Sequence, residues 1–151
     1  MKRVINSLAV FIMLGFSLSS CSEKDTNTSD ITVEGIEQNL ESGTWRVTLF
    51  EDSGKDETNH FTGYAFTFEE DGTLTADDGM NQVQGTWRIT NSHSDDDSPN
   101  DLDFNIFFDV SNDFEELNDD WDIISNTDMI IELIDISGGN GGTDYLTFER
   151  N

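Results

Sequence analysis

The chain contains the segment Gly43-Thr44-Trp45-Arg46-Val47-Thr48-Leu49-Phe50, whose opening recurs as Gly-Thr-Trp-Arg-Ile-Thr at 85–90. In the first copy, the apolar side chains of Trp45, Val47 and Leu49 alternate with polar ones. A period of two is typical of a β-strand with one face buried and the other in water. The segment therefore predicts a strand whose Trp45, Val47 and Leu49 point into a core.

The rest of the chain predicts more strands of the same kind. Alternating apolar residues are separated by turn signals such as Asp71-Gly72 and Asp78-Gly79. Asn112 begins a short helical turn between two of the strands. Eight short strands joined in order predict an all-β fold, an eight-stranded antiparallel up-and-down β-barrel. The seven strands after the first are expected at 61–69, 73–77, 81–90, 102–110, 120–126, 129–136 and 144–150.

A short N-terminal helix is expected before the first strand. Between Ile31 and Leu40, the residues Val33, Ile36 and Leu40 follow the three-and-four spacing of one helical stripe. Thr32 is suited to cap the start of this helix. Because so short a helix needs tertiary packing to persist, we expect it to lie across one end of the barrel.

Residues 1–20 have the pattern of a secretory signal peptide, with Lys2 and Arg3 followed by an apolar core and small residues. The end of this segment and the residue after it, Leu18-Ser19-Ser20-Cys21, resemble the lipobox of bacterial lipoproteins. The resemblance implies that Cys21 is acylated and becomes the new N-terminus; the alternative is an ordinary signal peptide with a cysteine near its cut. Residues 21–30 would then be a lipidated cysteine and a flexible tether, because 22–30 is polar throughout.

Charge and cysteine content exclude several classes of function. The chain has 32 acidic residues against 7 Lys and Arg, a net charge of −25, which becomes about −27 if Lys2 and Arg3 leave with the signal peptide. Such a surface repels nucleic acid, so no nucleic-acid partner is expected. Cys21 is the only cysteine, so acylation there would leave no thiol or disulfide. The acidic residues form either a solvated coat, which we favour, or an acidic binding surface.

The Gly-x-Trp opening at Gly43-Thr44-Trp45, the preceding helix, the eight strands and the late Arg150 together resemble the lipocalins. The chain is more closely similar to the lipocalin-like domain of small bacterial lipoproteins, over about residues 31–151. The resemblance implies that Trp45 closes the base of the barrel and that Arg150 packs over it. The chain departs from animal lipocalins in being shorter and in lacking both disulfides and a long C-terminal helix.

The inward positions of the predicted strands carry many aromatic residues. An eight-stranded barrel is either filled by its own side chains or holds one small ligand, and large aromatic side chains favour filling. Both alternatives stay open at this point. The candidate lining residues are Trp45, Tyr64, Phe66, Phe68, Trp87, Phe104, Phe108, Trp121 and Phe148.

No cofactor, metal site or catalytic site is expected. The acidic clusters at 95–97, 101–103 and 119–122 lack the spacing of an EF-hand loop, and the glycine-rich segment 138–142 with Asp144 is at most a single calcium-binding repeat. His60 and His93 are the only histidines, and no nucleophile elbow or phosphate loop is present. We therefore expect a protein that is not an enzyme.

These observations lead to two hypotheses about function. The first is a lipid-anchored, lipocalin-like lipoprotein of the bacterial outer membrane, facing the periplasm or the cell surface, which binds a small hydrophobic molecule in or at the mouth of the barrel. The second is a non-catalytic structural or adaptor lipoprotein, whose packed barrel presents acidic loops to a protein partner or to cations.

Overall fold

The computed structural model describes residues 32–91, 102–137 and 142–151. The predicted signal peptide, Cys21 and its tether, the acidic segment 95–97 with Asp101, and residues 138–141 of the glycine-rich segment lie outside the described residues. Among the helices of the described part, none has both the length and the apolar character needed to span a membrane.

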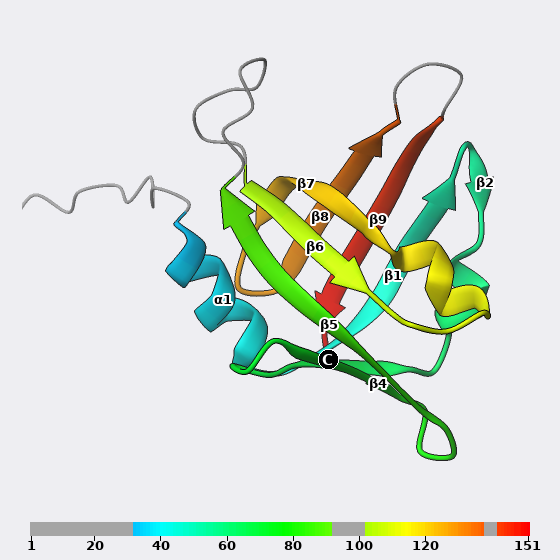
Figure 1. The fold of residues 1–151 in the computed structure, drawn as a ribbon, viewed down its shortest axis with the longest axis horizontal. Coiled ribbons are helices and arrows are strands. Elements are labelled where there is room, and N and C mark those ends of the chain that lie inside the picture. Colours follow the sequence, from blue (N-terminus) through cyan, green and yellow to red (C-terminus); the bar gives the residue numbers. More distant parts are fainter. Residues whose placement is uncertain (1–31, 92–101, 138–141) are drawn as a thin grey trace, which may run out of the picture.

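Most of the described chain is β-structure (Figure 1). The elements, in chain order, are α1 (Val33–Glu41), β1 (Thr44–Asp52), β2 (Lys55–Asp56), the 3-10 helix η1 (Thr58–Phe61), β3 (Ala65–Phe68), β4 (Thr73–Asp77), β5 (Gln82–Asn91), β6 (Leu102–Phe107), the 3-10 helix η2 (Asp113–Leu117), β7 (Asp119–Asn126), β8 (Ile130–Ile136) and β9 (Thr143–Arg150).

Eight of these strands close into an antiparallel barrel. From β3 to β9 each strand pairs with the next one in the chain, β1 pairs with β3, and β9 returns to β1. The two-residue β2 adds only to the far end of β1, outside the ring. Closure hides the strand edges, which would otherwise offer unpaired backbone groups to other chains. The predicted eight-stranded antiparallel barrel with one short helix is therefore confirmed.

A β-bulge in β1 changes which residues face the core. Val47 pairs with Phe148 but Leu49 pairs with Thr147, so Thr48 is an extra residue on this strand. Because successive side chains alternate between faces, one extra residue moves every later side chain to the opposite face. Phe50 is consequently 1% exposed, whereas Leu49 lies only half-buried. The prediction that Leu49 faces inward is wrong, and Phe50 takes that role.

The second predicted strand is shorter than expected. The interval 61–69 begins with Phe61 at the end of η1, and β3 starts only at Ala65. Gly63 between them has a φ of +90°, a conformation that favours glycine and redirects the chain. Phe61 is still buried, at 1% exposure, but its position comes from a helical turn rather than from strand alternation.

The strand predicted at 102–110 ends at Phe107. The backbone N–H of Phe108 donates to Asn118 Oδ1 at 2.6 Å, and Asn118 Nδ2 donates to the Phe108 carbonyl at 2.9 Å. A side-chain amide thus replaces a neighbouring strand and ends the ladder. Phe108 is buried, whereas Phe107 is 54% exposed.

The helix α1 lies against one end of the barrel, as expected (Figure 1). The Thr32 hydroxyl accepts a hydrogen bond from the Gly35 N–H at 3.1 Å and caps the helix. Ile36 and Leu40, four residues apart on one stripe, are completely buried. Their burial supplies the tertiary packing that a helix of nine residues requires.

Candidate functional site

The predicted lining residues meet in the interior of the barrel. Eight of them are at most 5% exposed: Trp45, Phe66, Phe68, Trp87, Phe104, Phe108, Trp121 and Phe148. The ninth, Tyr64, precedes β3 and lies half-buried, with its ring edge-on to Phe114 at 5.0 Å between centroids.

The inward aromatic rings touch one another across the barrel. Phe148 lies 5.3 Å from Phe66 and 5.6 Å from Phe68, measured between ring centroids. Phe68 also lies 5.4 Å from Trp87 and 5.6 Å from Phe104. Edge-to-face and tilted contacts at these distances are favourable and fill space efficiently. These rings therefore occupy the centre of the barrel themselves.

Three further phenylalanines, which the sequence analysis did not assign to the interior, pack at the end of the barrel opposite α1. Phe61 of η1 and Phe114 of η2 pack edge-to-face at 5.5 Å, and Phe50 of β1 lies 5.4 Å from Phe61. All three are at most 4% exposed. Sequence periodicity missed them because two lie in short 3-10 helices and one follows a bulge.

Trp45 and Arg150 come together at the α1 end. The guanidinium carbon of Arg150 lies 4.8 Å from the centre of the Trp45 ring. Arg150 Nη2 donates to the carbonyl and the side-chain oxygen of Asn39 at 2.8 and 2.6 Å, and Trp45 Nε1 donates to the Leu40 carbonyl at 2.9 Å. The end of the last strand is thereby connected to the end of the helix.

Two hollows on the described surface lie outside the barrel. One groove of about 540 Å³ runs over β5, β6 and β7 and contains the exposed ring of Phe107 beside Arg88 and Asp119. Another, of about 510 Å³, lies between α1 and the β3–β4 turn and contains Glu37, Glu41 and Arg88. Both carry charged side chains, so neither has the apolar lining typical of a site for a hydrophobic ligand.

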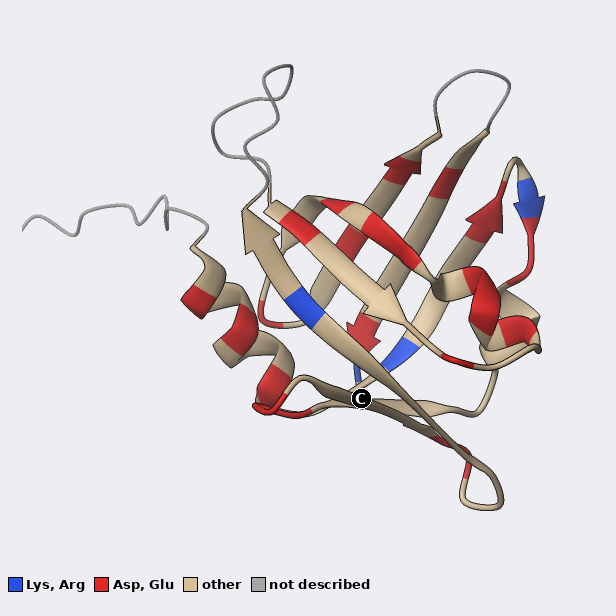
Figure 2. Cartoon of the chain, viewed as in Figure 1, with Lys and Arg blue, Asp and Glu red and all other residues tan. Residues whose placement is uncertain are grey.

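Strand alternation divides the acidic cluster predicted at 119–122. Asp119 pairs with the inward-facing Ile106, whereas Asp120 pairs with the outward-facing Asn105. Partial burial, with the nearby carboxylates of Asp135 and Asp120, raises the pKa of Asp119 to about 6. Acidic residues elsewhere are spread over helix, strands and turns (Figure 2). This distribution favours the solvated coat over one acidic binding surface.

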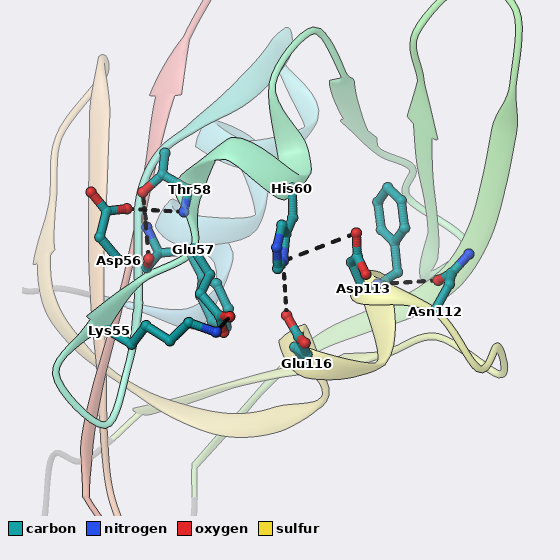
Figure 3. Close-up of polar contacts among 10 residues, drawn as sticks. Lys55, Asp56, Glu57, Thr58, His60, Asn112, Asp113 and Glu116 are labelled. Carbon is teal, nitrogen blue, oxygen red and sulfur yellow. Dashed lines mark hydrogen bonds and ion pairs between the residues drawn. The ribbon is translucent and has the colours of Figure 1, made fainter.

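A polar cluster connects the two 3-10 helices. We call Glu57, His60, Asp113 and Glu116 the η1–η2 cluster (Figure 3). His60 Nδ1 lies 3.2 Å from Glu116 Oε2 and 4.0 Å from Asp113 Oδ2. Ligand atoms of Glu57, His60 and Glu116 all lie within 4.8 Å of one another. The arrangement is capable of holding a metal ion, a capacity that the sequence analysis did not assign to these residues.

Local structure explains why these side chains converge. A 3-10 helix has three residues per turn, so side chains at i and i+3 stand above one another. Glu57 and His60 have this spacing at the start of η1, and Asp113 and Glu116 have it in η2. The contact between Phe61 and Phe114 holds the two helices together beneath the cluster. The spacing is visible in the sequence, but the 3-10 geometry and the contact are not.

Comparisons with known proteins identify no family for this chain. No family model matches the chain, and no curated protein matches it. Among solved structures, a DUF4847 family protein from Bacteroides vulgatus ATCC 8482 is similar over 78% of this chain and 98% of that chain, with 21% sequence identity and a TM-score of 0.48. A likeness at this level assigns neither a family nor a function. The chain is an eight-stranded antiparallel β-barrel, and its similarity to lipocalin-like lipoproteins stays a prediction from sequence.

Proposed function

We propose that the chain is a lipid-anchored, non-catalytic protein of the bacterial outer membrane, which uses a packed barrel as a rigid body to present its surface to a protein partner or to cations. The observation that carries this choice is the mutual packing of the inward aromatic rings, such as Phe68 with Trp87, Phe104 and Phe148. A barrel filled by its own side chains acts through its outer surface.

The first hypothesis from sequence, a small hydrophobic molecule inside the barrel, is less well supported. To admit such a ligand, rings such as Phe66 and Phe148 would have to separate, which would break contacts in a close-packed interior. The grooves on the described surface carry Arg88, Asp119 and glutamates rather than apolar side chains alone. A packed adaptor is therefore the function that the geometry supports best.

The anchor is proposed from the lipobox-like segment Leu18-Ser19-Ser20-Cys21, which the described residues do not include. One covalently attached acyl chain binds membranes only marginally, whereas several together give stable anchoring. The tether at 22–30 would span at most about 30 Å when fully extended. The barrel would thus work close to the membrane surface.

The anchor is tested by expressing the full-length chain and its Cys21→Ser variant in a bacterium fed a clickable fatty acid. We expect the wild-type chain to carry the label and sediment with membranes, and the variant to carry none. Ser22→Ala, which changes the next residue and leaves the cysteine, serves as the matched control. Equal labelling of the Cys21→Ser variant would refute the anchor.

The packed barrel is tested by native mass spectrometry of the same protein extracted from membranes. We expect no small molecule beyond the covalent lipid, and we expect cross-linking in intact cells to give a discrete protein adduct. A hydrophobic compound bound at one per chain would instead support the first hypothesis.

A further inference from the structure

We propose that the η1–η2 cluster binds one divalent transition-metal ion of the first row, with Glu57, His60 and Glu116 as ligands and Asp113 beside them. This proposal does not rest on the lipid anchor or on the packed barrel's role as an adaptor. It assigns a specific chemistry to one place on an otherwise diffusely acidic surface.

The geometry already approaches that of a metal site. Ligand atoms around an ion at about 2.1 Å lie roughly 3 to 4 Å apart. His60 Nδ1 and Glu116 Oε2 are 3.2 Å apart, and the Glu57 carboxylate completes a set whose atoms lie within 4.8 Å of one another. Small rotations of the His60 and Glu116 side chains would close the remaining distance.

The donor set selects the class of metal. Ca²⁺ and Mg²⁺ take oxygen ligands, whereas an imidazole nitrogen beside carboxylates suits zinc, iron, nickel and copper. His60 is the only histidine of the described residues, and it is placed among three carboxylates rather than in the open acidic surface. The site therefore favours a transition metal over calcium.

Burial of Glu57 is the feature that separates this cluster from solvated surface acid. Glu57 is 5% exposed and is the one buried charged residue of the described part of the chain. Burying a carboxylate is costly unless a charged partner compensates it. Its partner, Lys55, has a side chain that is 76% exposed. The charge of the Glu57 carboxylate is therefore balanced only by an ammonium group that faces solvent. A metal ion on the His60 side would supply a stronger, fixed positive charge.

The ion pair between Lys55 and Glu57 makes a directional prediction about metal affinity. Lys55 Nζ donates a hydrogen bond to Glu57 Oε1 and forms an ion pair with it, so this ammonium competes with a cation for the same carboxylate. Removing the ammonium in Lys55→Ala should leave Zn²⁺ binding at least as tight as in the wild type. Weaker Zn²⁺ binding in Lys55→Ala than in the wild type would contradict this competition.

Isothermal titration of the chelator-treated full-length chain with Zn²⁺ tests the proposal, with Ca²⁺ as the comparison ion. We expect one Zn²⁺ per chain and much weaker binding of Ca²⁺. His60→Asn should weaken Zn²⁺ binding by at least about tenfold, since loss of even an outer partner of a ligand costs that much. The control is His93→Asn, which removes the chain's other histidine and should bind as the wild type does.

A second measurement keeps the test independent of folding. Co²⁺ substituted for Zn²⁺ should give a visible absorption band in the wild type that is lost in His60→Asn and in Glu116→Gln, while tryptophan fluorescence shows that both variants are folded. Unchanged Zn²⁺ binding in His60→Asn would overturn the proposal. So would binding of Zn²⁺ and Ca²⁺ with the same weak affinity at many sites, which is the behaviour of a solvated acidic coat.

Discussion

The guanidinium carbon of Arg150 lies over the ring of Trp45, 4.8 Å from the ring centre. These residues are direct partners across the β1–β9 seam, where the barrel closes. Arg150 also donates two hydrogen bonds to Asn39, and Asn39 Nδ2 donates to Asn126 Oδ1 at 2.7 Å. One arginine thus joins the seam, the helix and the end of β7.

Replacing this arginine should destabilise the fold. Arg150→Ala removes charge-assisted hydrogen bonds and a cation–π contact, so we expect the free energy of unfolding to fall by about 2 to 3 kcal/mol. Urea denaturation followed by tryptophan fluorescence measures this change. Arg46→Ala breaks only the exposed pair with Glu149 and should cost less than about 1 kcal/mol. Equal losses in the two variants would show that Arg150 has no special role.

The aromatic pair between the two 3-10 helices should be essential to stability. Phe114→Ala removes a ring that packs against Phe61, Phe66 and Phe108, and it should cost about 3 to 5 kcal/mol through lost burial and a residual cavity. Thermal unfolding by circular dichroism measures the loss. Phe107→Ala removes a ring that is 54% exposed, and it should change stability by less than about 0.5 kcal/mol. A small loss in Phe114→Ala would contradict a packed interior.

The raised pKa of Asp119 should make stability depend on pH. Because the folded state holds this proton up to about pH 6 and the unfolded state releases it near 3.8, stability should fall as pH rises through that window. Asp119→Asn should therefore stabilise the protein at pH 7, by about 1 kcal/mol after allowance for solvent screening, and by little at pH 3.

Denaturation midpoints of the wild type and Asp119→Asn, measured from pH 3 to 8, test this sign. Glu132→Gln is the control, because Glu132 is exposed on the neighbouring strand β8 and is not among the charges that raise the pKa of Asp119. A gain in stability of Asp119→Asn that is independent of pH would point to better packing rather than to the protonation of Asp119.

Gly85 should not tolerate a side chain. A Cβ at this position would lie 2.4 Å from the Phe107 carbonyl oxygen and 2.6 Å from the Phe108 ring. Gly85→Ala should therefore cost about 1 to 3 kcal/mol through overpacking. At Gly43, the glycine of the first Gly-Thr-Trp copy, a Cβ would meet only Arg150 atoms at 3.7 Å or more, so Gly43→Ala should be milder. Equal thermal midpoints for the two variants would contradict this reading.

Local patterns in the sequence were enough to predict most of the barrel. Alternation and turn residues placed β4 at 73–77, as the structure has it, and β5, β7, β8 and β9 within a residue or so. The helical stripe with its Thr32 cap likewise predicted α1. These predictions succeed because period and capping depend on neighbours in the chain. The bulge at Thr48 and the early end of β6 at Phe107 depend on partners far away, and periodicity does not reveal them.

The candidate metal site shows the same division. The sequence alone shows two pairs of polar residues at a spacing of three and one histidine near each of two loops. It also shows an acidic excess too large for nucleic-acid binding. Folding brings His60 to Glu116, 56 positions later, through barrel closure and the contact of Phe61 with Phe114. Spacing along a chain sets which face a side chain takes, whereas long-range packing sets what that face meets.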